Sequence, residues 1–116
     1  MRLAMVRGDT RTFTVATTNP DGSEYNLQDC DMWFSVRTAY GATGYVFQKR
    51  VGNGITIPTP SNGIALVRVE NADTVGLPLV ETSCVFDVQL KAADGSVFTI
   101  NWGQFIVQPE VTTEIS

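Results

Sequence analysis

The fold is decided by the stretch TSCVFDVQLKAADGSVFTINWGQFIVQ, residues 82–108, where apolar and polar residues alternate on both sides of a turn. In its first half one face carries four apolar residues: Cys84, Phe86, Val88 and Leu90. The opposite face carries polar ones: Asp87, Gln89 and Lys91. Alternation with a period of two is typical of a half-buried strand, and ADG at 93–95 is a turn signal. The stretch predicts an antiparallel β-hairpin.

The second half of this stretch changes phase along its length. Phe98, Ile100 and Trp102 share one face, whereas the later apolar residues Phe105 and Val107 fall in the other phase. Gly103 lies at the slip, where an extra residue in one strand would shift the register, so we expect a β-bulge there. Because Trp102 is in phase with Phe98 and Ile100, we expect it to pack in the core.

The same alternation recurs along the rest of the chain. It predicts further strands within residues 10–17, 30–38, 45–49, 55–58 and 64–70. NPDG at 19–22 is a strong turn, and NGI at 53–55 and 62–64 indicates two tight hairpin turns. At most one short helical turn is expected, near residues 72–77, with Asn71 or Asp73 as N-cap and Gly76 as terminator. About 7–9 short strands of this kind form an all-β antiparallel sandwich or a small barrel.

Composition narrows the class of protein. With 116 residues the chain is expected to form one domain, residues 1–116, with candidate flexible arms at 1–6 and 111–116. The net charge of −4 and the scattered Lys and Arg residues disfavour nucleic acid as a partner. No apolar run is long enough to span a membrane, and MRLAMVRGDT lacks the apolar block of a secretory signal.

The absence of histidine argues against enzymatic chemistry. Without His the commonest general base, the Ser–His and Cys–His pairs and the commonest metal ligand are all missing. Asp29 with Asp31, or Asp21 with Glu24, lack the spacing of a calcium loop, and turn chemistry accounts for Asp21. We therefore expect no catalytic residues, no metal and no cofactor.

Arg7-Gly8-Asp9 matches a cell-adhesion tripeptide. Receptor binding requires the tripeptide on a projecting loop, whereas here it leads directly into the predicted strand that contains Phe13 and Val15. Gly8 then serves as a bend, and Asp9 with Thr10 as the turn that starts the strand. The structural interpretation is favoured.

The two cysteines leave two interpretations open. Cys30 and Cys84 are each in phase with the inward residues of their strands, as an inter-sheet disulfide would require. Trp33, however, follows Cys30 by three residues and in opposite phase, which differs from the antibody pattern. Two free thiols that act as small apolar side chains are favoured.

Trp33 is the main candidate for a binding surface. It lies on the face opposite Met32, Phe34 and Val36, beside Arg37, and Trp and Arg commonly anchor interfaces. The alternative is that a neighbouring loop covers Trp33, with a cation–π contact. The candidate interface residues are Met1, Leu3, Met5, Trp33, Arg37, Tyr40, Tyr45, Val111 and Ile115.

Several of these signatures resemble one family. They are RGDT-x-x-F-x-V at 7–15, DG…NL at 21–27, MWFSVRT at 32–38, VFQK at 46–49, the two NGI turns, GIALVRV at 63–69, ADT-x-x-L at 72–77, residues 86–107 and the closing VT at 111–112. Together they resemble the small immunoglobulin-like β-sandwich proteins of tailed bacteriophages, among them the N-terminal domain of phage baseplate upper proteins. The resemblance spans Arg7 to Thr112.

The resemblance implies an immunoglobulin-like β-sandwich and a structural role in the virion, assembled in the host cytoplasm. Such a protein would act in many copies by docking on other virion proteins, as a homo-oligomer, a symmetric ring or an array. The position could be baseplate, tail, neck or capsid surface, where it would serve as a decoration protein. The chain lacks the long C-terminal extension of a baseplate adaptor. A second interpretation, a carbohydrate- or cell-surface-binding module, would require an exposed aromatic platform, for which Trp33 and Tyr40 are the candidates.

Overall fold

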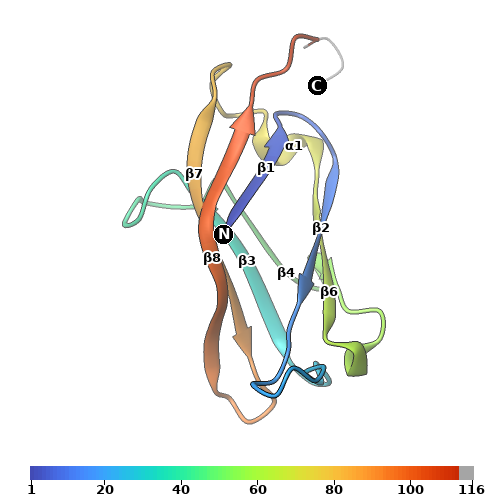
Figure 1. The fold of residues 1–116 in the computed structure, drawn as a ribbon. Coiled ribbons are helices and arrows are strands. Elements are labelled where there is room, and N and C mark those ends of the chain that lie inside the picture. The colour runs from blue at the N-terminus through green and yellow to red at the C-terminus, as the bar shows by residue number, and fades with distance from the viewer. Residues whose placement is uncertain (113–116) are drawn as a thin grey trace.

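The computed structural model describes residues 1–112 and is built almost wholly of strands (Figure 1). The strands are β1 Arg2–Val6, β2 Arg11–Ala16, β3 Asp31–Arg37, β4 Phe47–Val51, β5 Gly54–Thr56, β6 Ile64–Val69, β7 Thr82–Lys91 and β8 Val97–Gln108. The described residues contain two short helical turns, the 3-10 helix Pro60–Asn62 and α1 Asn71–Thr74, where at most one was expected. Among the described residues no helix has the length and apolar character needed to cross a membrane. The all-β fold class expected from the alternation is confirmed.

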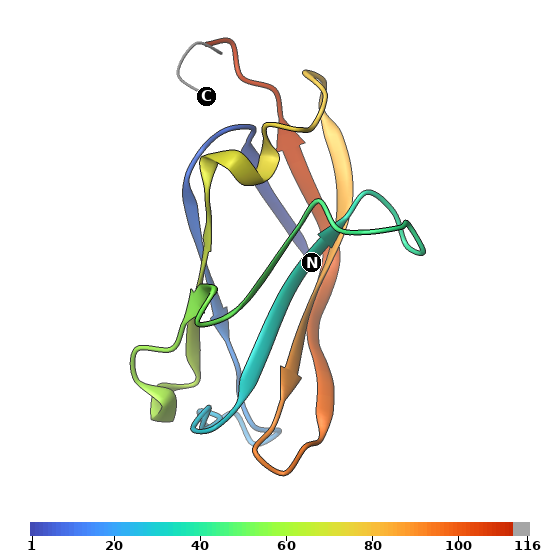
Figure 2. The ribbon, with the colours of Figure 1, turned by 180° about the vertical axis from the view of Figure 1, so that it is seen from behind.

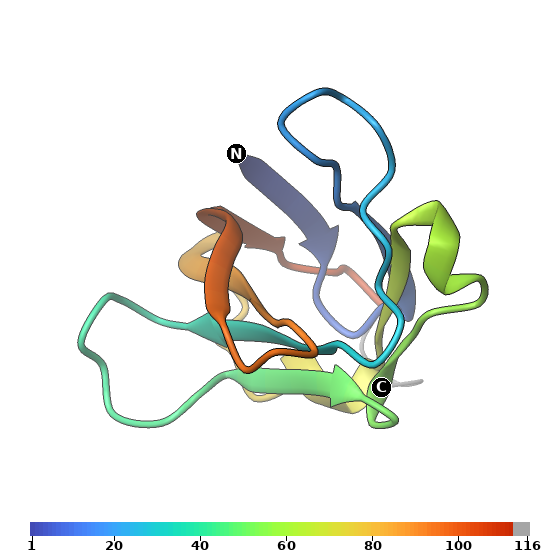
Figure 3. The same cartoon turned by 90° about the horizontal axis from the view of Figure 1, so that it is seen from below.

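The strands form one curled sheet in the order β1-β8-β7-β3-β4-β5-β6-β2. The sheet bends back on itself around the core, so the molecule resembles a barrel left open between β1 and β2 (Figures 1 and 3). Two pairings, β1 with β8 and β4 with β5, are parallel, which corrects the expectation of a wholly antiparallel arrangement. The turn at 53–55 therefore joins parallel neighbours and is not a hairpin. The chain enters β5 through Gly52 and Gly54, which have φ values of 86° and 97°.

A cluster of phenylalanines fills the interior. Phe34 on β3 is fully buried and stacks on Phe86 of β7 with ring centroids 5.5 Å apart. Phe105 of β8 meets Phe34 edge to face at 6.2 Å, and Phe13 and Phe47 complete the cluster. Aromatic pairs at such distances add about 0.5–1.5 kcal/mol each beyond the area they bury. The inward faces expected from the alternation of β3 and β7 are confirmed.

The β-bulge in β8 lies earlier than expected. Val88 pairs with Asn101 while the next residue, Gln89, pairs with Thr99, so Ile100 is the extra residue. The phase of β8 has already slipped when the chain reaches Trp102, which pairs with Asp87. Trp102 is consequently on the outer face and 60% exposed, and the expectation that it packs in the core is wrong.

Gly103 has a different role from the one expected. A Cβ atom there would lie 1.9 Å from the carbonyl oxygen of Met1, a distance that no side chain tolerates. The adjacent amide of Gln104 donates to that same carbonyl at 3.1 Å. Glycine at 103 therefore lets the start of β1 approach β8 closely.

The N-terminal segment is a strand and not the expected flexible arm. β1 runs parallel to β8, from Arg2 opposite Gln104 to Val6 opposite Gln108. Met5 on this strand is only 3% exposed and packs into the core. At the other end, residues 111 and 112 follow β8 outside any strand, and the remainder of the second expected arm, residues 113–116, lies outside the described residues.

α1 confirms a helical turn in the expected region, with a different cap. Its N-cap is Glu70, which precedes the expected Asn71 and Asp73, and its C-cap is Val75. Glu70 and Asp73 form a capping box, in which the Glu70 amide donates to the Asp73 carboxylate at 2.7 Å. The same carboxylate binds the ammonium of Lys49, a core-facing residue of β4, at 2.7 Å. This largely buried ion pair was not expected.

Candidate functional site

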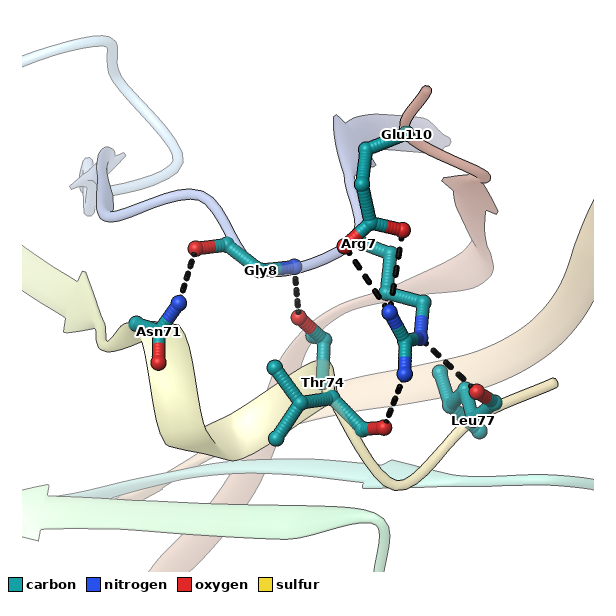
Figure 4. Close-up of polar contacts among 7 residues, drawn as sticks. Arg7, Gly8, Asn71, Thr74, Leu77 and Glu110 are labelled. Atoms are coloured by element: carbon teal, nitrogen blue, oxygen red, sulfur yellow. Dashed lines mark hydrogen bonds and ion pairs between the residues drawn. The ribbon is translucent and has the colours of Figure 1, made fainter. Parts of the chain in front are cut away.

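Arg7 organises one pole of the molecule (Figure 4). Its guanidinium donates two hydrogen bonds to the carboxylate of Glu110, at 3.0 and 2.8 Å. The remaining nitrogens donate to the backbone carbonyls of Leu77, at 2.8 Å, and Val75. One side chain thus joins the end of β1, the segment after α1 and the segment after β8.

The other residues of the adhesion-like tripeptide are also engaged by the fold. The Gly8 amide donates to the hydroxyl of buried Thr74 at 2.8 Å, and its carbonyl accepts from the Asn71 side chain at 2.6 Å. The Asp9 amide closes a turn on the Val6 carbonyl at 3.1 Å. The structural interpretation of Arg7-Gly8-Asp9 is confirmed, because the Arg and Gly hold α1 against the turn that enters β2.

Four exposed aliphatic side chains lie at the pole that Arg7 ties together. Each is within three residues of a group bonded to Arg7, or next to Arg7 itself. They are Val6, Leu79, Val80 and Val111, with exposed fractions of 37%, 54%, 59% and 99%. We call these four residues the apolar pole. Single exposed aliphatic residues are ordinary, whereas several gathered at one end of a small domain indicate a contact surface.

A second surface lies on the flank of the molecule. The outer faces of β3, β4 and β7, with the loop between β3 and β4, line an open groove of about 740 Å³. Figure 2 shows that loop projecting beyond the sheet. We call this open groove the aromatic groove. Its lining residues include Trp33, Arg37, Tyr40, Tyr45, Gln48 and Gln89. Four of these, Trp33, Arg37, Tyr40 and Tyr45, were interface candidates from the sequence, and the fold brings them together.

Each of two rings in the groove is held by an arginine. The Arg50 guanidinium lies 5.0 Å from the ring centroid of Trp33 and is bonded to the Asp31 carboxylate at 2.9 and 2.6 Å. The Arg37 guanidinium lies 4.3 Å from the ring centroid of Tyr45 and donates to a backbone carbonyl of the loop. The covering group of Trp33 therefore comes from the neighbouring strand and not from a loop.

The position of the Arg50 guanidinium beside the Trp33 ring is expected to depend on pH. The hydrogen bond from Arg50 is the main cause that lowers the pKa of Asp31 below its ordinary value. The pKa of Asp31 is lower in the folded than in the unfolded protein. The stabilisation from its ion pair with Arg50 is therefore fully present above the unfolded-state pKa of about 3.9, and it is lost as the pH falls through the folded-state pKa. In a Trp102→Phe background, Trp33 fluorescence should change in this acid range before global unfolding. Asp31→Asn should remove the transition, and an unchanged acid transition in that variant would contradict the assignment.

The remaining interface candidates among residues 1–112 do not line the groove. Met1 and Val111 are exposed, at 69% and 99%, and Leu3 is half-buried on β1. Met5 packs in the core, because its strand pairs with β8, so its assignment to an interface is corrected. Ile115 lies outside the described residues.

The other candidate positions are explained by local structure. Cys30 and Cys84 are both free, as the sequence favoured, and burial raises the pKa of each thiol. Asp21 accepts from the amide and hydroxyl of Ser23, and these bonds lower its pKa. Among residues 1–112 no group of three or more His, Cys, Asp or Glu side chains could hold a metal ion.

Comparison with known proteins adds no relative. No protein-family model matches the sequence, and no curated protein matches it.

Proposed function

We propose that this protein is a structural component of a tailed-bacteriophage virion, held in the particle by docking of its apolar pole on other virion proteins. The observation that carries the proposal is the pole itself, since Val6, Leu79, Val80 and Val111 are each exposed on segments that Arg7 ties together. Burial of apolar area is the main driving force of protein association. The sequence resembles small phage β-sandwich proteins, and this resemblance is the reason for proposing the virion as the assembly in which the protein docks.

The pole is built to keep its shape when it docks. The bonds from Arg7 to the Leu77 carbonyl and to Glu110 fix the segments that carry Leu79 and Val111. A surface that is already ordered loses little conformational freedom on binding, which favours affinity. A docking role in many identical copies is consistent with such a preformed surface.

The open seam of the barrel offers a second means of assembly. β1 and β2 end the strand order, and the Arg11 side chain links them by one bond to the Ala4 carbonyl at 2.7 Å. The outer edge of β2, with Thr12 and Thr14 exposed, can pair with a strand of a neighbouring subunit. Pairing along this edge would generate the rings or arrays that the proposal requires.

The experiment is incorporation of variants into phage particles. Leu79→Asp combined with Val80→Asp places two charges on the pole, and we expect the copy number in purified particles to fall by about tenfold or more, because buried unpaired charges are costly. Mass spectrometry of the particles measures the copy number, which also separates a ring from a shell-wide decoration. Val97→Asp, an exposed aliphatic residue at the far hairpin, is the matched control and should incorporate normally. Normal incorporation of the double variant would refute docking by the pole.

A further inference from the structure

The aromatic groove has the form of a ligand site that docking by the pole leaves free. It is open along the flank, with a volume of about 740 Å³, within the range of small-molecule sites in proteins. Its charged lining residues, Arg37, Lys91 and Asp87, are of both signs. Neither a phosphate-rich ligand nor a wholly apolar one suits such a lining.

Two rings of the groove are fixed before any ligand arrives. Arg50 stands over one side of Trp33, which is half-buried on the outer face of β3. Arg37 holds Tyr45, which is 47% exposed, while Tyr40 on the same loop is 75% exposed. Rigid aromatic rings supply large contact areas at a low cost in conformational entropy.

Planar polar side chains line the groove on the strands that flank β3, where Gln89 of β7 is paired with Trp33 and Gln48 of β4 with Ser35. The Gln48 amide nitrogen donates to the Ser35 hydroxyl at 2.9 Å, and the Gln89 amide nitrogen donates to the Thr99 hydroxyl at 3.3 Å. Each bond fixes an amide and turns its carbonyl oxygen into an oriented acceptor. Asp87 stands in the same row of the sheet as Ser35, which adds a carboxylate to the acceptors.

We propose that the aromatic groove binds a neutral oligosaccharide. A sugar presents an apolar face of C–H groups and a rim of adjacent hydroxyls, and these two features match the fixed rings and the oriented acceptors. The rings of Trp33 and Tyr45 stack on the sugar faces, and the carbonyls of Gln48 and Gln89 accept from the hydroxyls. The open ends of the groove select a chain of sugars over a single one.

Trp102 extends the same surface. It lies on the outer face of β8, two strands from Trp33 and displaced by two residues in register. Strand spacing and rise place the two Cα atoms about 12 Å apart. A ligand that contacts both rings must therefore be longer than one sugar unit.

The test is binding of purified full-length protein to an array of bacterial-envelope oligosaccharides. The strongest-binding compound is then titrated by calorimetry against the wild type, three groove variants and one control variant. Trp33→Ala and Tyr45→Ala should each weaken binding by about tenfold or more, since buried aromatic anchors dominate binding energy. Tyr45→Phe keeps the ring and should bind nearly as the wild type does.

Leu79→Ala at the apolar pole is the control and should bind as the wild type does. Thermal unfolding of each variant verifies that the fold is intact, and exposed Tyr45 keeps the test valid if Trp33→Ala unfolds. The proposal is overturned if no arrayed glycan binds above background. It is also overturned if Trp33→Ala and Tyr45→Ala each bind the glycan as tightly as the wild type does. The glycan proposal and the docking proposal fail separately, because one is measured on the isolated protein and the other on particles.

Discussion

Replacing Arg7 with methionine is expected to lower the free energy of unfolding by about 3–5 kcal/mol, the cost of removing one partner of a buried pair. The Arg7 and Glu110 side chains are only 14% and 11% exposed, so the Glu110 carboxylate would lose the two hydrogen bonds from Arg7 where water reaches it poorly. The carbonyls of Val75 and Leu77 would also lose their donor. Since small domains have about 5–15 kcal/mol in total, the loss is a large share of the stability. Urea unfolding measures the shift in midpoint.

Two further variants separate the geometry of Arg7 from its charge. Arg7→Lys keeps the charge, but an ammonium cannot reproduce the forked contact with three partners, so we expect an intermediate loss. Arg2→Met, at an exposed position on β1, the strand that precedes Arg7, should change stability by no more than about 0.5 kcal/mol. An Arg7→Met midpoint equal to that of Arg2→Met would show that the pole does not depend on Arg7.

Replacing Asp73 with asparagine is the second large expected loss, again about 3–5 kcal/mol. The side chain of Lys49 is 11% exposed, and its ammonium would remain charged without the carboxylate that lies 2.7 Å away. Asparagine can still accept from the Glu70 amide, so the cap of α1 is largely kept and the measured loss reports the ion pair. Chemical denaturation measures the change.

A double variant tests that reading of Asp73→Asn. Lys49→Met with Asp73→Asn removes both charges, and methionine keeps the apolar stem on which Gly54 packs. We expect the double variant to recover most of the stability, because an apolar replacement of a whole buried pair is often neutral. A double variant no more stable than Asp73→Asn alone would argue against an unpaired Lys49 charge as the cause.

The strands were predictable because their signal is local. The alternating positions of Met32, Phe34 and Val36 indicate which face of β3 is buried, and this indication does not require knowledge of the partner strand. Trp102 could not be placed in the same way, because its orientation depends on the bulge at Ile100, which exists only relative to the partner strand β7. β1 was missed for a related reason, since five residues gain a strand conformation here by pairing with β8.

The residues of the candidate site also divide into those that could be predicted from the sequence and those that could not. Trp33, Arg37, Tyr40 and Tyr45 could be selected by residue type and phase, and the fold places all four in the aromatic groove. The roles of Gln48 and Gln89 were not predictable, because cross-strand register brings them beside the rings. Of the apolar pole only Val111 was selected from the sequence, as the pole depends on the bonds that Arg7 makes to distant segments.

The parallel pairing of β1 with β8 has a consequence for synthesis of the protein. Residues 2–6 leave the ribosome before the other strands of the sheet, and their partners at 104–108 emerge about a hundred positions later. Until then the nascent chain carries an unpaired strand whose Met5 has no core to enter. The sheet is thus completed only after residue 108 has been translated and has cleared the ribosome. Such non-local closure is slow and exposes strand edges to other nascent chains until β8 is available.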